Sequence, residues 1–165
     1  MEISDMEDKS IHFVLDMELN KLPLDQAFRA YFIGLFFTAS WCPPCESFAY
    51  QLYEVYQEAN AKEKIFEVIQ ISNEKTEKDM DHEILAHKRN WYYVPHNDIL
   101  MYDLIDEFDV KFLPVLIVIN KDRVVLSKSG RQDIKELGKK AYEKWYNSYR
   151  LEKNKDKEIL DNLDV

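Results

Sequence analysis

The chain has few of the residues on which several classes of protein depend. Its 165 residues include only 3 glycines, 5 prolines and 2 cysteines. A bound nicotinamide or flavin needs a glycine-rich turn, and no G-x-G-x-x-G fingerprint occurs. We therefore expect no built-in redox cofactor.

Positive charge and long apolar runs are also scarce. The formal net charge is −9 and the isoelectric point lies near 5.0, which argues against a nucleic-acid surface. The longest apolar stretches, residues 30–37 and 112–119, are far too short to span a bilayer. Residues 1–10 are acidic and resemble neither a secretory signal nor a transit peptide. We expect no nucleic-acid or membrane partner and a place in the reducing cytoplasm or the nucleus.

The remaining composition suits one domain with a substantial core. Hydrophobic residues make up 46% of the chain, and no repeat or low-complexity segment occurs. We expect an acidic N-terminal segment over residues 1–10, a domain over 11–149, and a charged tail over 150–165 that is frayed or helical.

Apolar periodicity predicts alternating strands and helices within this domain. Strands are expected at residues 11–15, 31–38, 65–72, 115–119 and 123–126, helices at 24–29, from 43 onward, at 75–88, 99–108 and 132–149, and an aromatic loop at 91–97. This order predicts an α/β fold in which helices flank a central mixed β-sheet on both faces. Such sheets place their sites beyond the carboxyl ends of central strands.

Both cysteines lie in Trp41-Cys42-Pro43-Pro44-Cys45, after an apolar run and at the start of a predicted helix. Two intervening residues let the first helical turn bring both sulfurs within bonding distance, while the first thiol stays exposed. A helix N-terminus lowers the pKa of a nearby thiol because its positive end favours the thiolate. The spacing predicts thiol–disulfide exchange with Cys42 as nucleophile and Cys45 as resolving thiol.

Three other readings of the cysteine pair are weaker. A zinc site needs two more ligands, and the four histidines (His12, His82, His87 and His96) form no second pair with ligand spacing. A structural disulfide would close only a tiny loop in a chain large enough to fold on its core. Two buried, inert thiols remain an alternative, which the flanking tryptophan and double proline disfavour. We expect no metal.

Several segments resemble the thioredoxin superfamily, and more closely its tryparedoxin and nucleoredoxin branch. Residues 39–45 carry the Trp-Cys-Pro-Pro-Cys motif of that branch, Phe112-Leu113-Pro114 resembles the superfamily's cis-proline loop, and residues 91–95 resemble a Trp-x-x-x-Pro segment. Residues 130–145 resemble the closing helix of nucleoredoxin-like proteins. The resemblance covers roughly residues 28 to 148.

This resemblance implies a thioredoxin-like fold and roles for the residues around the dithiol. Pro114 is expected to be cis and to shape the site together with Pro43, Pro44 and Trp41, which covers the cysteine pair. Leu113 is expected to pair its backbone with an incoming substrate chain. The Trp91 loop is expected to contribute to substrate binding.

Two positions depart from the family pattern. Thioredoxin has a buried acid near its dithiol that accepts the proton of the resolving cysteine, whereas Phe36 occupies the matching position here. Proton transfer must then use water or another group. Tryparedoxins usually place a basic residue after the second cysteine, whereas this chain has Glu46, which we interpret as a surface carboxylate that caps the helix.

The sequence favours a protein disulfide reductase that acts on protein disulfides and receives electrons from an external reductase or a small dithiol. The alternative is a redox-dependent interaction module of the nucleoredoxin-like type, whose two redox states bind a partner with different affinity and which turns over little.

Overall fold

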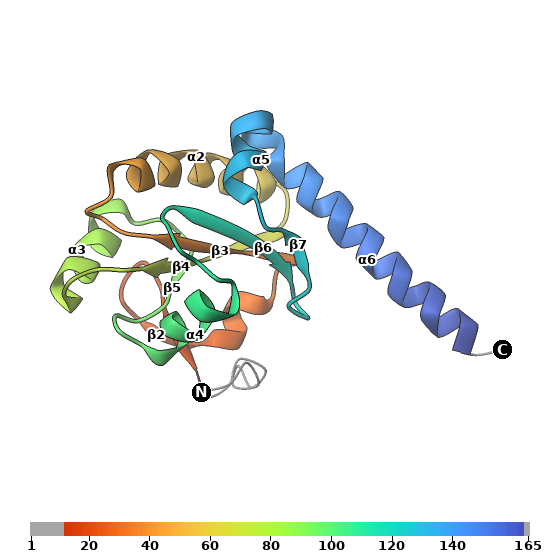
Figure 1. The fold of residues 1–165 in the computed structure, drawn as a ribbon, viewed down its shortest axis with the longest axis horizontal. Helices are drawn as coiled ribbons and strands as arrows, with labels where there is room; N and C mark the ends of the chain where they lie inside the picture. Colours follow the sequence, from red (N-terminus) through yellow and green to blue (C-terminus); the bar gives the residue numbers. More distant parts are fainter. Residues whose placement is uncertain (1–11, 164–165) are drawn as a thin grey trace.

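Helices cover both faces of a mixed seven-stranded sheet in the computed structural model, which describes residues 12–163 (Figure 1). The strand order is β2-β1-β5-β4-β3-β6-β7. The strands are β1 (Phe13–Leu15), β2 (Lys21–Pro23), β3 (Phe32–Thr38), β4 (Phe66–Ser72), β5 (Tyr92–Tyr93), β6 (Val115–Asn120) and β7 (Val125–Ser127). Strand β3 pairs in parallel with β4 and antiparallel with β6, which confirms the predicted mixed sheet.

The sheet separates the core into two layers, and helices cover each layer. The helices are η1 (Leu24–Phe28), α2 (Pro43–Ala59), α3 (Glu77–His87), α4 (Ile99–Glu107), α5 (Gly130–Leu137), η2 (Gly138–Lys140) and α6 (Ala141–Leu163). One face of the sheet packs against α2, α3, α5 and α6, and the other against η1 and α4. Every residue of β3 is buried because the strand lies in the middle of the sheet with a helical layer on each side.

Helix α2 follows β3 after a short loop and carries the cysteines at its first turn. Its buried face includes Phe48, Leu52 and Val55, which pack on the sheet. The two prolines stand at the first helical positions, where the missing N–H costs least. This packing fixes the dithiol beyond the carboxyl end of β3.

The C-terminal helix differs from its predicted form. One helix was expected over residues 132–149, but the helix is interrupted at Gly138, whose φ of 60° ends α5. L side chains rarely adopt this backbone conformation, so glycine is required there. Asp133 of α5 joins the two helices by accepting hydrogen bonds from Lys144 Nζ (2.7 Å) and Trp145 Nε1 (2.8 Å).

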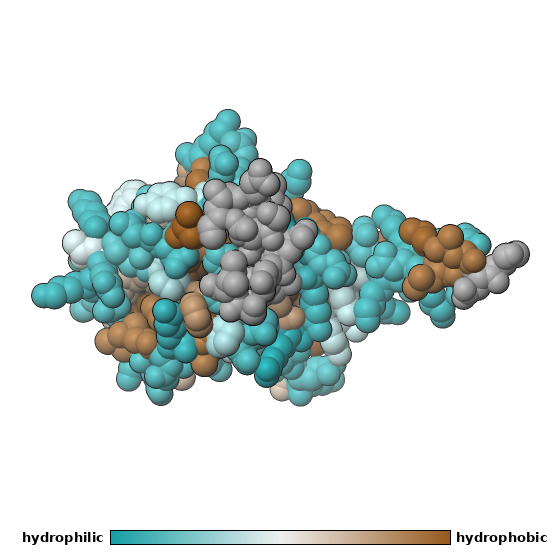
Figure 2. Space-filling model, turned by 90° about the horizontal axis from the view of Figure 1, so that it is seen from below, coloured by the Kyte–Doolittle hydropathy of each residue, from teal (hydrophilic) through white to brown (hydrophobic). Residues whose placement is uncertain are grey.

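Helix α6 continues to Leu163 and projects away from the sheet (Figure 1). Figure 2 shows apolar side chains near its far end, where Ile159, Leu160 and Leu163 are more than half exposed. The tail that was expected to be frayed or helical is thus helical over residues 150–163. The predicted acidic segment at residues 1–10 lies outside the described residues.

Two smaller differences concern the side of the sheet formed by β2, β1 and β5. Strand β2 was not predicted, and it pairs antiparallel with β1. Residues 91–97 were expected to form a loop, but Tyr92 and Tyr93 form strand β5 between β1 and β4. Tyr93 is buried in the core, and Tyr92 is partly buried and packs against it.

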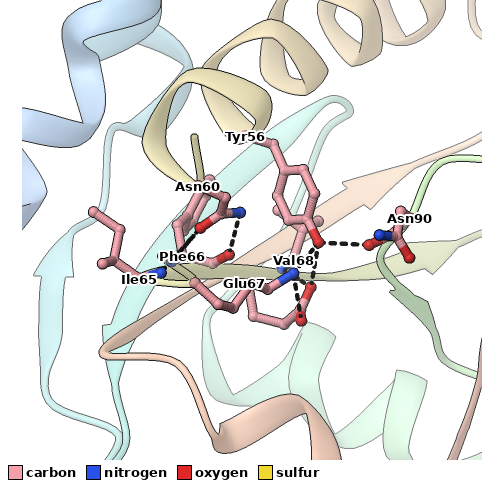
Figure 3. Close-up of polar contacts among 8 residues, drawn as sticks. Tyr56, Asn60, Ile65, Phe66, Glu67, Val68 and Asn90 are labelled. Carbon is pink, nitrogen blue, oxygen red and sulfur yellow. Dashed lines mark hydrogen bonds and ion pairs between the residues drawn. The ribbon is translucent and has the colours of Figure 1, made fainter. Parts of the chain in front are cut away.

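A buried polar cluster lies at the amino end of β4, the end of the central strands opposite to the dithiol (Figure 3). Glu67 Oε1 accepts a hydrogen bond from the backbone N–H of Val68 (2.9 Å) and lies 3.2 Å from Tyr56 Oη. Lys64 Nζ lies 3.1 Å from Glu67 Oε2. Burial raises the pKa of Glu67 above its ordinary value, although Lys64, the Val68 N–H and Tyr56 oppose the shift.

This raised pKa predicts how the difference in stability between the wild type and Glu67→Gln depends on pH. Above the ordinary carboxyl pKa, the unfolded chain releases its proton before the folded chain does, so the wild type loses stability as pH rises. The loss amounts to about 1.4 kcal/mol for each pKa unit of elevation. Urea unfolding should therefore show that the free energy of unfolding of Glu67→Gln rises relative to that of the wild type between pH 4 and pH 8. The exposed control Glu54→Gln should track the wild type, and a pH-independent difference for Glu67→Gln would contradict the expectation.

Candidate active site

The two cysteines form a disulfide at the start of α2. Cys42 is the N-cap residue of the helix, Cys45 lies in its first turn, and their Cα atoms are 5.3 Å apart. Cys42 is 9% exposed and Cys45 is fully buried. Of the two cysteines, only Cys42 lines the cavity beside the cis-proline loop.

The loop before β6 packs against the dithiol. The Leu113–Pro114 peptide bond is cis, which confirms the predicted isomer. The side chain of Leu113 packs against Ala39, Cys42 and Cys45. Within residues 12–163, the N–H and C=O groups of Leu113 have no backbone hydrogen-bond partner. Leu113 also lines the cavity that Cys42 lines, shortly before the first paired residue of β6.

The loop before Cys42 is held by the loop after β4. Glu74 is buried and accepts hydrogen bonds from the backbone N–H of Ser40 (2.7 Å) and from Ser40 Oγ (2.5 Å). The indole N–H of Trp41 donates to the carbonyl of Asn73 (2.8 Å), and 55% of the Trp41 side chain is exposed. Sequence reasoning missed Glu74, because its partner lies 34 residues earlier and nothing local marks the contact.

Two cavities flank the cis-proline loop. The first, of about 400 Å³, is lined by Trp41, Cys42 and Leu113 together with apolar side chains of β3, β4 and α4. The second, of about 720 Å³, is lined by Pro44 and Pro114 and by the beginning of α5. Phe112, which is 68% exposed, lines both cavities.

Trp91 does not belong to this site, so its predicted role in substrate binding is wrong. The side chain is 2% exposed and packs edge-on against Phe36 and Tyr56. Its indole N–H donates to Gln70 Oε1 at 3.1 Å, and the residue lines neither cavity beside the dithiol. A buried acceptor for the indole N–H makes Trp91 a core residue.

The structure places the two departures from the family pattern plainly. Phe36 is fully buried, and its ring packs against Phe48 with centroids 5.6 Å apart. Glu46 is exposed in the first turn of α2, as expected of a surface carboxylate, but within residues 12–163 no side-chain hydrogen bond caps this helix, so its capping role stays a prediction. Among residues 12–163, no group of three or more His, Cys, Asp and Glu side chains is placed to hold a metal ion.

Comparison with known proteins identifies the family. The sequence profile of thioredoxin-like proteins matches residues 31–125, more than half of the chain. The chain belongs to the thioredoxin-like family. It is 32% identical to probable nucleoredoxin 3 of Oryza sativa over 135 residues, which cover 81% of this chain and 28% of that protein. The chain thus spans less than a third of the length of the plant nucleoredoxins it matches.

Solved structures of this family share the fold. Thioredoxin from Wuchereria bancrofti is 28% identical, with a TM-score of 0.71 over 78% of this chain and 88% of that one. Tryparedoxin II from C. fasciculata is 30% identical, with a TM-score of 0.66 over 76% of this chain and 82% of that one. Thioredoxin-like proteins are thiol–disulfide oxidoreductases, and this member has its cysteine pair at the start of α2.

A helix that crosses a bilayer needs about 20 mostly apolar residues. No helix between residues 12 and 163 combines this length with this apolar character.

Proposed function

We propose that this chain is a protein disulfide reductase that works by dithiol–disulfide exchange. The unequal placement of the two cysteines carries the proposal, because Cys42 lines a surface cavity while Cys45, bonded to it, is fully buried. A pair that only stabilised the fold would not need a member in the wall of a surface cavity, where Cys42 lies. Membership of the thioredoxin-like family supports the same chemistry.

The reaction begins with the reduced chain. The N-terminus of α2 favours the thiolate of Cys42, which attacks one sulfur of a substrate disulfide. The substrate S–S bond breaks, its other sulfur leaves and takes up a proton, and Cys42 is joined to the substrate. Cys45 then loses its proton and attacks Cys42 Sγ, so the second substrate thiol leaves and the Cys42–Cys45 disulfide forms. Two electrons pass from the chain to the substrate.

The surrounding residues would position the substrate for this attack. The open N–H and C=O of Leu113 would pair with the extended chain on one side of the substrate cysteine. The exposed indole of Trp41 would add apolar contact, and Pro43, Pro44 and Pro114 would shape the loops on which these groups stand. With Phe36 in place of an acid, the proton of Cys45 would leave through water or another group.

The oxidised chain must be reduced again before it can act a second time. We propose that an external reductase or a small dithiol supplies the electrons and that no bound cofactor takes part. Such recycling requires a reducing compartment, the cytoplasm or the nucleus. Disulfide-bonded proteins would be the partners, with neither nucleic acid nor membrane among them.

Insulin reduction with dithiothreitol as electron donor tests the proposal. A reductase should reduce many insulin disulfides per chain, at a rate that is proportional to the concentration of the chain and exceeds the dithiothreitol background. At most one turnover, combined with partner binding that changes with redox state, would instead identify a redox-dependent interaction module. The doubly substituted Cys42→Ser, Cys45→Ser chain provides the background.

A further inference from the structure

The larger cavity beside the dithiol is lined by positive charge. Three exposed cations, Lys128, Arg131 and Lys135, line it, and among residues 12–163 no carboxylate does. The rest of the lining consists of uncharged polar and apolar residues. The chain as a whole carries a net charge of −9, so this wall is opposite in sign to the molecule.

The carboxylate two residues after Arg131 already has partners. Asp133, buried in the first turn of α5, accepts hydrogen bonds from Lys144, Trp145 and Ser127 and points into the core side of the helix. Burial alone would raise the pKa of Asp133, but these bonds hold it below its ordinary value. Within residues 12–163, none of the three cations of the cavity forms an ion pair.

The beginning of α5 is held close to the sheet beside these cations. A Cβ atom on Gly130 would lie 2.6 Å from the buried side chain of Leu116, so any larger residue would push α5 away from β6. The close approach leaves the backbone at the start of α5 in the cavity wall, where the positive end of the helix adds to the three side chains. The cavity thus gathers positive charge from two sources.

The position of the cavity ties this charge to the redox site. Pro44, between the two cysteines, and Pro114, beside the dithiol, both belong to its lining. A chain paired with Leu113 would therefore pass the mouth of this cavity within a few residues of the cysteine under attack. Carboxylates on that chain would meet Lys128, Arg131 and Lys135.

We propose that the cavity binds acidic side chains of the substrate, so that the chain prefers disulfides flanked by Asp or Glu. This inference rests on the proposed function and names the substrate class of the same site. A single exposed ion pair is weak, but three cations around one cavity raise the rate of encounter with an anionic segment. The preference must therefore weaken as salt increases.

Single-turnover reduction of matched peptides tests the inference. Three peptides of equal length, each with one internal disulfide, carry two Glu, two Gln or two Lys beside the same cysteine. The reduced chain should reduce the Glu peptide about tenfold faster than the Gln peptide at low salt, and the Lys peptide most slowly. The difference between the Glu and Gln peptides should shrink toward equality in 1 M salt.

Charge reversal provides the matched comparison. The triple variant Lys128→Glu, Arg131→Glu, Lys135→Glu should reverse the order of the Glu and Lys peptides. Lys157→Glu makes one such charge reversal on the projecting part of α6 and should keep the wild-type order. An unchanged order in the triple variant would overturn the inference.

The outcomes separate the inference from the proposed function. Equal rates with the Glu and Gln peptides would refute the acidic preference and leave the reductase proposal standing. If no peptide were reduced, the reductase proposal would fail, and fluorescence anisotropy would then decide the inference with Ser-for-Cys versions of the peptides. Tighter binding of the Glu form than of the Gln form would support the basic cavity as an acidic-segment site, and equal binding would refute it.

Discussion

Replacing Cys42 with serine should reduce insulin turnover to the dithiothreitol background, whereas Cys45→Ser should stop the reaction after its first step. Cys42 lines the smaller cavity whereas Cys45 is fully buried, so without Cys42 we expect no bond to the substrate to form. Without Cys45, the bond between Cys42 and the substrate forms but nothing resolves it. Mass spectrometry under non-reducing conditions should find a stoichiometric adduct of Cys45→Ser with the substrate.

The control and the opposing result are equally direct. The double serine variant should form no adduct, which rules out attachment at another group. In the reduced wild type, Cys42 should be alkylated much faster than Cys45 by iodoacetamide, because Cys45 is fully buried. Equal alkylation rates, or an adduct that maps to Cys45 in the wild type, would reverse the assigned roles.

Removing the Glu74 carboxylate should loosen the loop that carries Trp41 and Cys42. Glu74→Ala deletes both hydrogen bonds to Ser40 and leaves a space where a buried carboxylate stood. Hydrogen bonds to charged groups contribute about 1.5–3 kcal/mol each. Because Ser40 is exposed, we expect the loss of both bonds to lower the free energy of unfolding by about 3 kcal/mol, the lower end of the range. Turnover should fall severalfold because Cys42 no longer has a fixed position. Urea unfolding and insulin reduction measure the two effects.

A conservative variant distinguishes positioning from chemistry. In Glu74→Gln, the amide oxygen can accept from the Ser40 N–H and the amide N–H can donate to Ser40 Oγ, so most of the stability and turnover should return. Glu63→Ala removes an exposed carboxylate from the loop after α2 and should leave both properties near the wild-type values. If Glu74→Gln were as slow as Glu74→Ala but as stable as the wild type, the carboxylate would take part in proton transfer instead.

The centre of the fold could be predicted because its signals are local. Residues 31–38 form an unbroken apolar run, as a strand buried on both faces requires, and β3 occupies residues 32–38. The cysteine spacing and the prolines at the start of a helical pattern located the dithiol at the first turn of α2. The Leu113–Pro114 segment was identified through its resemblance to a known loop, and the structure shows it packed against the cysteines.

The misread parts depend on contacts between distant residues or on competing signals. Ile134, Leu137, Ala141 and Trp145 keep one helical period across Gly138, so the apolar pattern hid the break that the glycine makes. Trp91 was assigned to substrate binding because nothing in its own segment marks its hydrogen-bond acceptor, Gln70, which lies 21 residues earlier on β4. The basic cavity likewise needs tertiary structure, because α5 brings its cations to prolines from two other segments.

The stoichiometry of electron transfer tests the central claim most directly. The reduced chain would be separated from the reductant and mixed with an excess of insulin. The intact mass of the chain and the number of new insulin thiols would then be measured. The account predicts that each chain loses two hydrogens, forms the Cys42–Cys45 disulfide and releases two thiols from one insulin disulfide. A chain that keeps its reduced mass while insulin remains intact would contradict it.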